Sequence, residues 1–224
     1  MTRTAIIAAF AGELKPIVRG WTHERCNGVD TWSHRDDNLY VAACAGAGQA
    51  AATRAFAAIE ESAPIDLVFS VGWAGALTPD LMPGTAHNVA GVIDSRTGER
   101  FRCDAGAGPL WLVTHSRVAN PSDKLRLAST CSAALVDMEA AAIGRLAAMR
   151  GIPFYCIKGI SDGLTANLPD FNHFLSPTGQ LELPRLVLFA LFRPTYWHVL
   201  IQMGENGRKA SQSIAESLHD FLDE

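Results

Sequence analysis

Four acidic residues of this 224-residue chain are placed where they could do acid–base chemistry. Glu13, the pair Asp137 and Glu139, and Asp162 each follow a separate apolar run of strand length. Taken singly, each also fits a structural role, as a helix first turn that complements the dipole or as a turn former. In open α/β sheets, however, ligands bind at the carboxyl ends of the strands. We therefore expect Glu13, Glu139 and Asp162 to meet in one cavity, where a ligand or water satisfies them.

Two glycine-containing turns are expected at the same edge. Gly46-Ala47-Gly48 opens an alanine-rich segment, and Gly72-Trp73-Ala74-Gly75 follows another apolar run. Glycines at such turns let backbone N–H groups approach a polar ligand. A lone Gly-x-Gly is a weak signal, because it most often reflects simple strand-to-helix packing.

The elements that must position these residues alternate between strand and helix patterns. Apolar runs predict strands at residues 4–10, 39–45, 66–71, 85–93, 110–114, 133–136 and 153–157, and periodic patterns predict helices after Gly48 and at residues 138–150, 181–192 and 208–222. The segment 116–130 is harder to place, with a helical turn at about 122–127. The alternation predicts an α/β fold, which we expect to be one three-layer α/β/α domain over residues 1–224 around a mixed, mostly parallel central sheet.

Composition narrows the function classes. The net charge is −4 and Lys and Arg are scattered along the chain. The sequence therefore shows no basic cluster that would bind nucleic acid, and we expect a small-molecule partner. The five cysteines are widely spaced and suit free thiols of a reducing compartment. No metal-ligand pattern stands out. The apolar run near the N-terminus is too short to span a membrane, so we expect a cytoplasmic protein without stable membrane insertion.

Several motifs carry a resemblance to a known family. They are IIAAFAGEL at residues 6–14, AGAGQAAA at 45–52, VGWAG at 71–75, VDMEA at 136–140 and KGISD at 158–162. In this order they resemble the nucleoside phosphorylase superfamily, and particularly its methylthioadenosine/adenosylhomocysteine nucleosidase branch. The C-terminal part, with Arg193-Pro194 and residues 207–210, more loosely resembles the hopanoid-associated phosphorylase group.

The resemblance implies cleavage of the N-glycosidic bond of a purine-type nucleoside through an oxocarbenium-like transition state, with no cofactor. Asp162 would share a proton with the leaving base, and Glu13 would activate water. Glu139 would hold the ribose hydroxyls. Met138 would pack against the sugar, and Lys158 and Ser161 would support Asp162. Gly48 and Gly75 would line the nucleophile end, and Asp137 is a further substrate-binding position that the resemblance implies.

Departures from the family pattern concern the base and the nucleophile. Asp137 stands where nucleosidases usually have a glutamate, and Trp73 stands where a serine is common near the nucleophile. The position of the usual aromatic stacker offers only Val118. Three alternatives follow: hydrolysis, slightly favoured because Glu13 supplies a base; phosphorolysis with phosphate as co-substrate, including action on a 5′-substituted, hopanoid-type adenosine; and an inactive nucleoside-binding protein.

The resemblance also implies a homodimer. The apolar run at residues 186–192 and the residues around Trp197 are candidates for its interface. Burial of this run under the last helix is an equally good interpretation.

Overall fold

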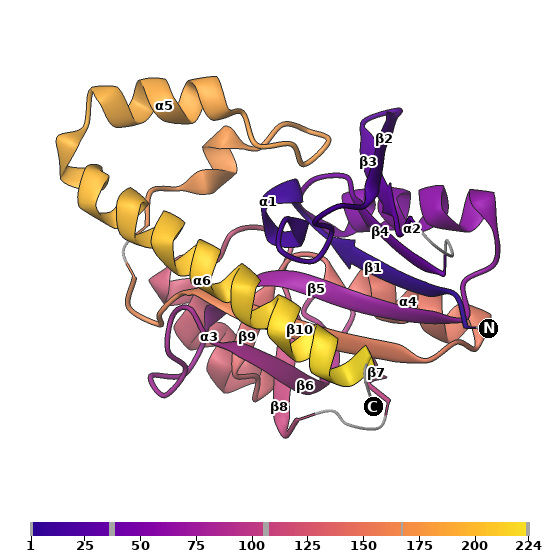
Figure 1. The fold of residues 1–224 in the computed structure, drawn as a ribbon. Helices are drawn as coiled ribbons and strands as arrows, with labels where there is room; N and C mark the ends of the chain where they lie inside the picture. The colour runs from indigo at the N-terminus through magenta and orange to yellow at the C-terminus, as the bar shows by residue number, and fades with distance from the viewer. Residues whose placement is uncertain (1, 36–38, 105–107, 167, 223–224) are drawn as a thin grey trace.

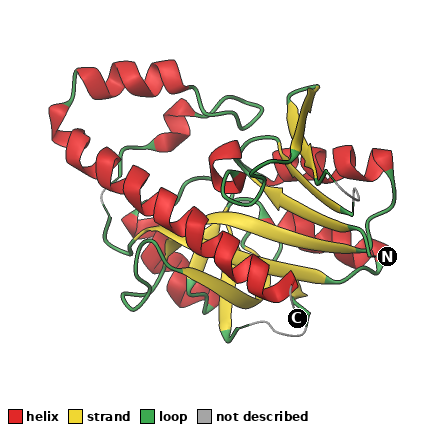
Figure 2. Ribbon diagram, viewed as in Figure 1, coloured by secondary structure: helices red, strands yellow, loops and turns green. Residues whose placement is uncertain are grey.

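The computed structural model describes residues 2–35, 39–104, 108–166 and 168–222, and it has a mixed α/β architecture (Figures 1 and 2). The strands are β1 (Thr4–Ala8), β2 (Thr22–Cys26), β3 (Val29–Ser33), β4 (Tyr40–Cys44), β5 (Leu67–Ala76), β6 (Ala86–Asp94), β7 (Arg100–Arg102), β8 (Leu110–Thr114), β9 (Leu135–Asp137) and β10 (Phe154–Asp162). The helices are α1 (Ala11–Leu14), α2 (Gln49–Ser62), α3 (Pro121–Cys131), α4 (Ala140–Arg150), α5 (Leu183–Leu191) and α6 (Trp197–Leu222), with 3₁₀ turns η1 (Phe171–Phe174) and η2 (Pro194–Tyr196).

The strands form one mixed sheet, as predicted, in the order β10-β6-β8-β9-β5-β1-β4-β3-β2. Parallel pairings join β4, β1, β5 and β10 in one block and β6, β8 and β9 in another. Antiparallel pairings of β10 with β6 and of β5 with β9 connect the two blocks. Because β10 also pairs with β5, this half of the sheet closes on itself, and the ends of β5, β9 and β10 come together.

Helices pack on both faces of the sheet (Figure 1). Strand β1 is buried throughout, and its side chains alternate between two apolar clusters, as the two-residue period of a strand requires. Ala5 and Ile7 pack with residues of α2 and α4, whereas Ile6 and Ala8 pack with residues of α1 and α6. The sequence shows no polar alternation in β1 because both of its faces are covered.

Two helices differ from their predicted bounds. The segment around 116–130 forms the full helix α3, whose N-terminus is fixed by the Asn120 side chain accepting from the Asp123 N–H at 2.8 Å and by Pro121 in the first turn. The last helix begins at Trp197 rather than at residue 208, because η2 is followed directly by 26 helical residues. Its predicted buried stripe holds for Ala210, Ile214 and Leu218.

The apolar run at residues 186–192 is not buried under the last helix. Helix α5 has no buried residue, and it stands away from the sheet at one end of the molecule (Figure 1). That interpretation of the run is therefore wrong, since the long helix α6 packs its C-terminal part on the sheet while its start extends outward with α5.

Candidate active site

A cavity of about 520 Å³ lies at the carboxyl ends of the central strands. Glu13 reaches it from α1 directly after β1, Glu139 from the junction of β9 and α4, and Asp162 from the end of β10. The structure thus brings together three carboxylates that are far apart along the chain. Each is at least nine-tenths buried, so their charge states depend on the protein groups around them.

Backbone N–H groups hold Glu13. One carboxylate oxygen accepts from Ala9 at 2.9 Å and from Phe10 at 2.8 Å, and the other accepts from Trp73 at 2.7 Å. Burial raises the pKa of Glu13, and these three donors oppose the rise. Gly72 permits the contact, because its φ is +127° and a Cβ there would lie 2.9 Å from a Glu13 oxygen.

Glu139 directly precedes α4, and its side chain is held by a glycine turn. Its Oε1 accepts from the Gly48 N–H at 2.6 Å, and its Oε2 from the Met138 N–H at 3.2 Å. Burial, with the nearby charge of Asp137, raises the pKa of Glu139 to about 8, although Lys158 and the Gly48 N–H oppose the rise. Near neutral pH this carboxyl can therefore exist in either charge state.

Asp137 has a different environment from Glu139. Its Oδ1 accepts from the Thr114 hydroxyl at 2.7 Å, and its Oδ2 accepts from the Ala140 N–H at 2.9 Å and lies 3.0 Å from Lys158 Nζ. Both charged side chains are essentially inaccessible. Burial lowers the pKa of Lys158, but the charges of Asp137, Cys156 and Glu139, with the hydrogen bond to Asp137, together outweigh burial and hold the pKa above its ordinary value. This pair fixes the junction of β9, β10 and α4.

Asp162 is bonded by its neighbour in sequence and by a lysine from α3. The Ser161 hydroxyl donates to Oδ1 at 2.6 Å. Lys124 Nζ donates to Oδ2 and also to the Gly163 carbonyl at 2.6 Å. A Cβ on Gly75 would stand 3.1 Å from Lys124 Cε and 3.3 Å from Asp162 Oδ2, so a glycine in β5 leaves room for this pair.

Trp73 closes one side of the cavity. Its indole N–H lies 3.0 Å from the Gly207 carbonyl and 2.9 Å from the Ser211 hydroxyl, both in α6. The backbone N–H of the same residue donates to Glu13. The ring of Trp73 is thus held by α6, while its backbone holds the Glu13 carboxylate.

An apolar wall comes from the C-terminal third of the chain. Phe171 of η1 lines the cavity together with Val118. The two segments are joined because Asn172 accepts from the Val118 N–H at 2.9 Å and donates to the Val118 carbonyl at 3.3 Å. The rest of the wall is formed by Leu168, Leu175, Leu181, Leu183 and Met203.

Most of the predicted site residues border this cavity. They are Glu13, Trp73, Gly75, Val118, Asp137, Met138, Glu139, Ser161 and Asp162. Gly48 is not among the lining residues, but its backbone N–H donates to the Glu139 carboxylate. Lys158 pairs with Asp137 instead of supporting Asp162, so the expectation that it assists Asp162 is wrong for this structure.

Sequence reasoning missed Lys124 and Phe171. The Asn120-Pro121 start of α3 was a usable signal for the helix that carries Lys124. Nothing local marked Phe171, since its place depends on a long-range contact. Within the described residues no group of three or more His, Cys, Asp or Glu is arranged to hold a metal ion.

Comparisons with known proteins agree with this architecture. A family model, the phosphorylase superfamily, matches residues 95–177. No curated protein sequence matches the chain.

Solved structures of nucleosidases are similar over nearly the whole chain. The 5′-methylthioadenosine/S-adenosyl homocysteine nucleosidase of Helicobacter pylori is 15% identical with a TM-score of 0.73, covering 99% of this chain and 98% of its own. The 5′-methylthioadenosine nucleosidase of Arabidopsis thaliana is 14% identical with a TM-score of 0.75, covering 100% and 95%. The futalosine hydrolase of Helicobacter pylori is 15% identical with a TM-score of 0.73, covering 99% and 97%. The looser resemblance of the C-terminal part to the hopanoid-associated group stays a prediction. The predicted resemblance to the phosphorylase superfamily is confirmed by the family model over residues 95–177, and the chain has the same fold as these nucleosidases.

Proposed function

We propose that this protein cleaves the N-glycosidic bond of a purine-type nucleoside, with water as the nucleophile. The observation that carries the proposal is the meeting of Glu13, Glu139 and Asp162 around one cavity. The match to the phosphorylase superfamily and the likeness to structures of nucleosidases support it. Such a reaction needs negative charge near a cationic sugar and a proton source near the departing base.

Glu139 is the proposed ligand of the ribose hydroxyls. A carboxylate that accepts two hydroxyl hydrogen bonds orients the sugar, and Met138 beside it offers an apolar surface. Hydrogen bonds from the ribose hydroxyls would favour the ionised form of Glu139, to which the Gly48 N–H already donates. Because the pKa of Glu139 in the free protein is about 8, this binding would change its charge state near neutral pH. Binding and ionisation of this group are therefore coupled.

Lys124 and Asp162 are the proposed leaving-group pair. As the glycosidic bond breaks, its electrons pass to the base, whose N7 takes a proton from the pair. An ammonium group has three N–H donors, and Asp162 and Gly163 take two from Lys124. We assign the third to the base, because Lys124 lines the cavity. Ser161 holds the other Asp162 oxygen in place.

Glu13 is the proposed base for water. The water gives a proton to the carboxylate while its oxygen bonds to the anomeric carbon. Two features favour water over phosphate. The Trp73 ring, fixed on α6, takes up space in the same cavity as Glu13. Arg117 is the one arginine among the described cavity-lining residues, and it is paired with Asp123 at 3.1 Å.

Phe171 is the proposed stacking partner of the base. It lies with Val118 on the cavity wall, where sequence comparison offered only the valine. An aromatic ring next to a purine contributes both apolar contact and stacking.

The test is release of free base from a panel of purine nucleosides, with and without inorganic phosphate. We expect release without phosphate, and a loss of about 10²-fold or more in Asp162→Asn, which keeps the shape but not the carboxyl. Release that strictly requires phosphate would make the protein a phosphorylase. If wild type and Asp162→Asn both bind a nucleoside and neither releases base, the protein is an inactive binder.

We also propose a cytoplasmic location and a homodimeric state. Free cysteines throughout the described chain suit a reducing compartment. Light scattering of the purified chain tests the dimer.

A further inference from the structure

Residues 183–204, called here the apolar arm, carry an unusual share of the exposed apolar side chains. The arm comprises α5, η2 and the start of α6. Seven large apolar side chains in it are exposed: Leu183, Val187, Leu188, Leu191, Phe192, Trp197 and Ile201, between 49% and 75%. Contiguous apolar surface of this kind marks contact with a membrane or another protein.

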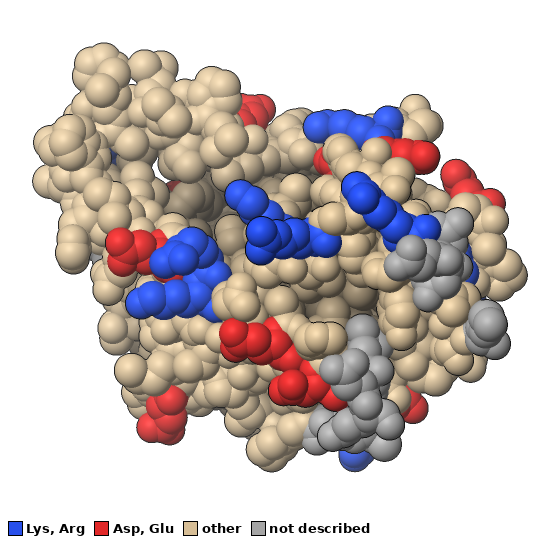
Figure 3. All heavy atoms as spheres, viewed as in Figure 1, with Lys and Arg blue, Asp and Glu red and all other residues tan. Residues whose placement is uncertain are grey.

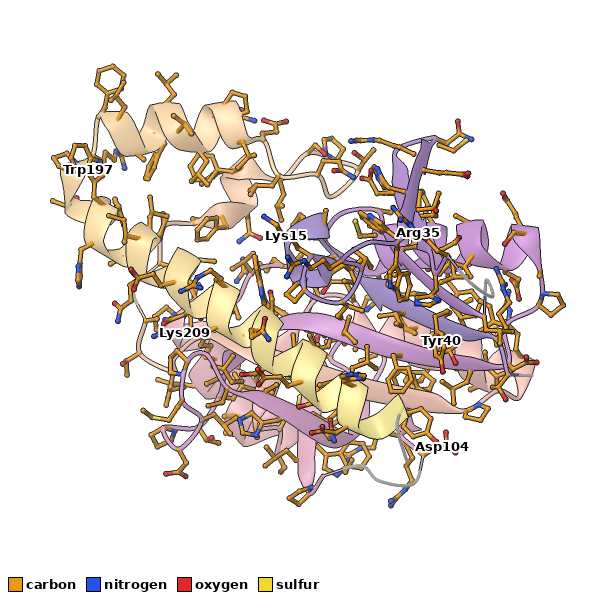
Figure 4. The ribbon with its side chains drawn as sticks, in the orientation of Figure 1. Lys15, Arg35, Tyr40, Asp104, Trp197 and Lys209 are labelled. Carbon is orange, nitrogen blue, oxygen red and sulfur yellow. The ribbon has the colours of Figure 1, made fainter. Side chains whose placement is uncertain are left out.

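We propose that the apolar arm docks this protein on the surface of an anionic lipid bilayer. The inference is independent of the proposed reaction. In Figure 3 the surface over α5 and the start of α6 is largely uncharged, and in Figure 4 the labelled Trp197 lies at the outer end, where the chain turns from α5 into α6.

The charge of the arm distinguishes a bilayer from other partners. Its 22 residues include no Asp or Glu, and its charged residues are Arg185 and Arg193, although the whole chain has a net charge of −4. Arg193 stacks on Phe189 at 4.7 Å, and Arg185 pairs with Glu182 just outside the arm. Glu182 and Glu205 adjoin the two ends of the arm, but between them its only charges are cationic. Apolar segments that carry cations and no anions are typical of segments that rest on anionic membranes.

Aromatic side chains concentrate at the bend. Phe192, Tyr196 and Trp197 lie where α5 gives way to α6, and the Trp197 indole N–H donates to the Ala190 carbonyl at 2.6 Å. Tryptophan and tyrosine are enriched at the headgroup level of membranes, because one part of each ring is apolar and the other can hydrogen-bond. The bend therefore has the composition of an interfacial anchor.

The geometry favours lying on the bilayer rather than crossing it. Within the described residues no single helix is long and apolar enough to cross a membrane. The pair Leu183–Leu191 and Pro194–Asp220 has that length and composition only when taken together, and it is bent by 111°. Helix α5 has nine residues, or about 14 Å, against a hydrocarbon core of about 30 Å. A bent pair of this size can rest its apolar side in the interface.

The arm also borders the cavity. Leu183 and Met203 line the cavity, while Val187, Leu191 and Ile201 on the same elements are exposed. Docking by the arm would bring the cavity close to the lipid surface, so that an amphipathic molecule could pass between the bilayer and the site.

The experiment is flotation of the full chain with vesicles of equal phosphatidylcholine and phosphatidylglycerol, compared with phosphatidylcholine alone. We expect binding to the mixed vesicles to be about tenfold stronger. The double variant Val187→Glu/Leu191→Glu should lose about tenfold or more of this binding, because it places two charges on one exposed helix face away from the cavity. The matched control Met82→Glu/Met149→Glu, at apolar side chains exposed to 64% and 74% elsewhere, should bind as wild type.

A second measurement detects the environment of Trp197 in the arm. Tryptophan fluorescence should shift to the blue on adding mixed vesicles, and Trp197→Phe should remove the shift. Circular dichroism melts establish that each variant is folded. Wild type that ignores both vesicle types, or arm variants that bind as well as wild type, would overturn the proposal. So would a wild-type dimer, indifferent to vesicles, that the arm variant converts to monomer, since a second copy would then be the occupant.

Discussion

Replacing Lys124 by methionine tests the proposed leaving-group pair most directly. The substitution keeps an unbranched side chain of similar length and removes the ammonium group. In the folded protein this group is bonded to Asp162 and to the Gly163 carbonyl, and the lysine side chain is 2% exposed. The change therefore leaves a largely buried carboxylate with the Ser161 hydroxyl as its remaining side-chain donor.

The expected magnitudes follow from this geometry. Removing one partner of a buried ion pair costs about 3–5 kcal/mol, and water in the cavity can reach Asp162, so we expect the lower end, about 3 kcal/mol. For a chain of this size that lowers Tm by about 6–12 °C. Loss of a positioned proton donor should reduce kcat/KM for a purine nucleoside by about 10²-fold or more, equivalent to about 2.7 kcal/mol of transition-state stabilisation.

The assay compares two leaving groups. A purine needs a proton as it departs, whereas 4-nitrophenolate leaves from a 4-nitrophenyl riboside as a stable anion. Lys124→Met should therefore lose far more activity on the nucleoside than on the nitrophenyl riboside, for which we expect a loss of less than about tenfold. Equal losses on both substrates would refute the reasoning, because they would make Lys124 a structural residue only.

Lys158→Met is the matched control. Lys158 is the second buried lysine paired with an aspartate, but its partner is Asp137 and neither side chain is accessible. Its loss should destabilise the fold by a similar amount without changing the ratio of the two activities. A changed ratio in this control would show that the ratio does not report on the leaving group.

Three further predictions concern other residues of the cavity. The folded-state pKa of Glu139, about 8, lies above its ordinary 4.5, so between these two values the folded state binds more protons than the unfolded state. The stability of wild type relative to Glu139→Gln, from denaturant titrations, should therefore fall as pH rises from 4.5 to 8, and a constant difference would contradict the assignment. Phe171→Ala should raise KM for purine nucleosides by about tenfold, in line with the loss of about 1 kcal/mol of stacking and some apolar contact, while leaving KM for a nitrophenyl riboside closer to wild type; steady-state kinetics on both substrates decides it. Glu13→Gln should reduce hydrolysis by about 10²-fold without weakening nucleoside binding measured by calorimetry, and weakened binding would place Glu13 on the ribose.

The sequence predicted those parts of the site that local patterns encode. Glu13, Glu139 and Asp162 were identifiable because each lies at or shortly after the end of a buried strand, and the sheet then fixes where strand ends lie. The mixed sheet was predictable for the same reason. Roles that depend on which neighbour a side chain meets were less predictable, as the two buried lysines illustrate: Lys158 lies in the same strand as Asp162 but bonds Asp137, and Lys124 comes from a distant helix.

The C-terminal third was least predictable. Residues 181–222 read as two apolar helical stretches with a break, which is compatible with a buried helix as well as with an exposed one. The structure separates the two cases, because the stripe with Ala210 and Ile214 packs on the sheet whereas α5 contacts mainly its neighbours η1 and η2. Hydrophobicity alone cannot distinguish a face that meets the core from one that meets another surface.

The charges around the cavity connect the fold to the proposed chemistry. Four carboxyls, those of Glu13, Asp137, Glu139 and Asp162, face two ammonium groups, those of Lys124 and Lys158. Each lysine bonds one aspartate, and among the residues that the structure describes Glu13 and Glu139 form no ion pair. A neutral nucleoside gains little from this excess of negative charge, whereas a ribosyl cation in the transition state gains much, since interactions that strengthen only in the transition state accelerate the reaction. Burial raises the pKa values of both glutamates in the free protein, and the nearby charge of Asp137 adds to the rise at Glu139. The energetic cost of burying these groups is thus the counterpart of the stabilisation that the cavity can offer to a cationic sugar.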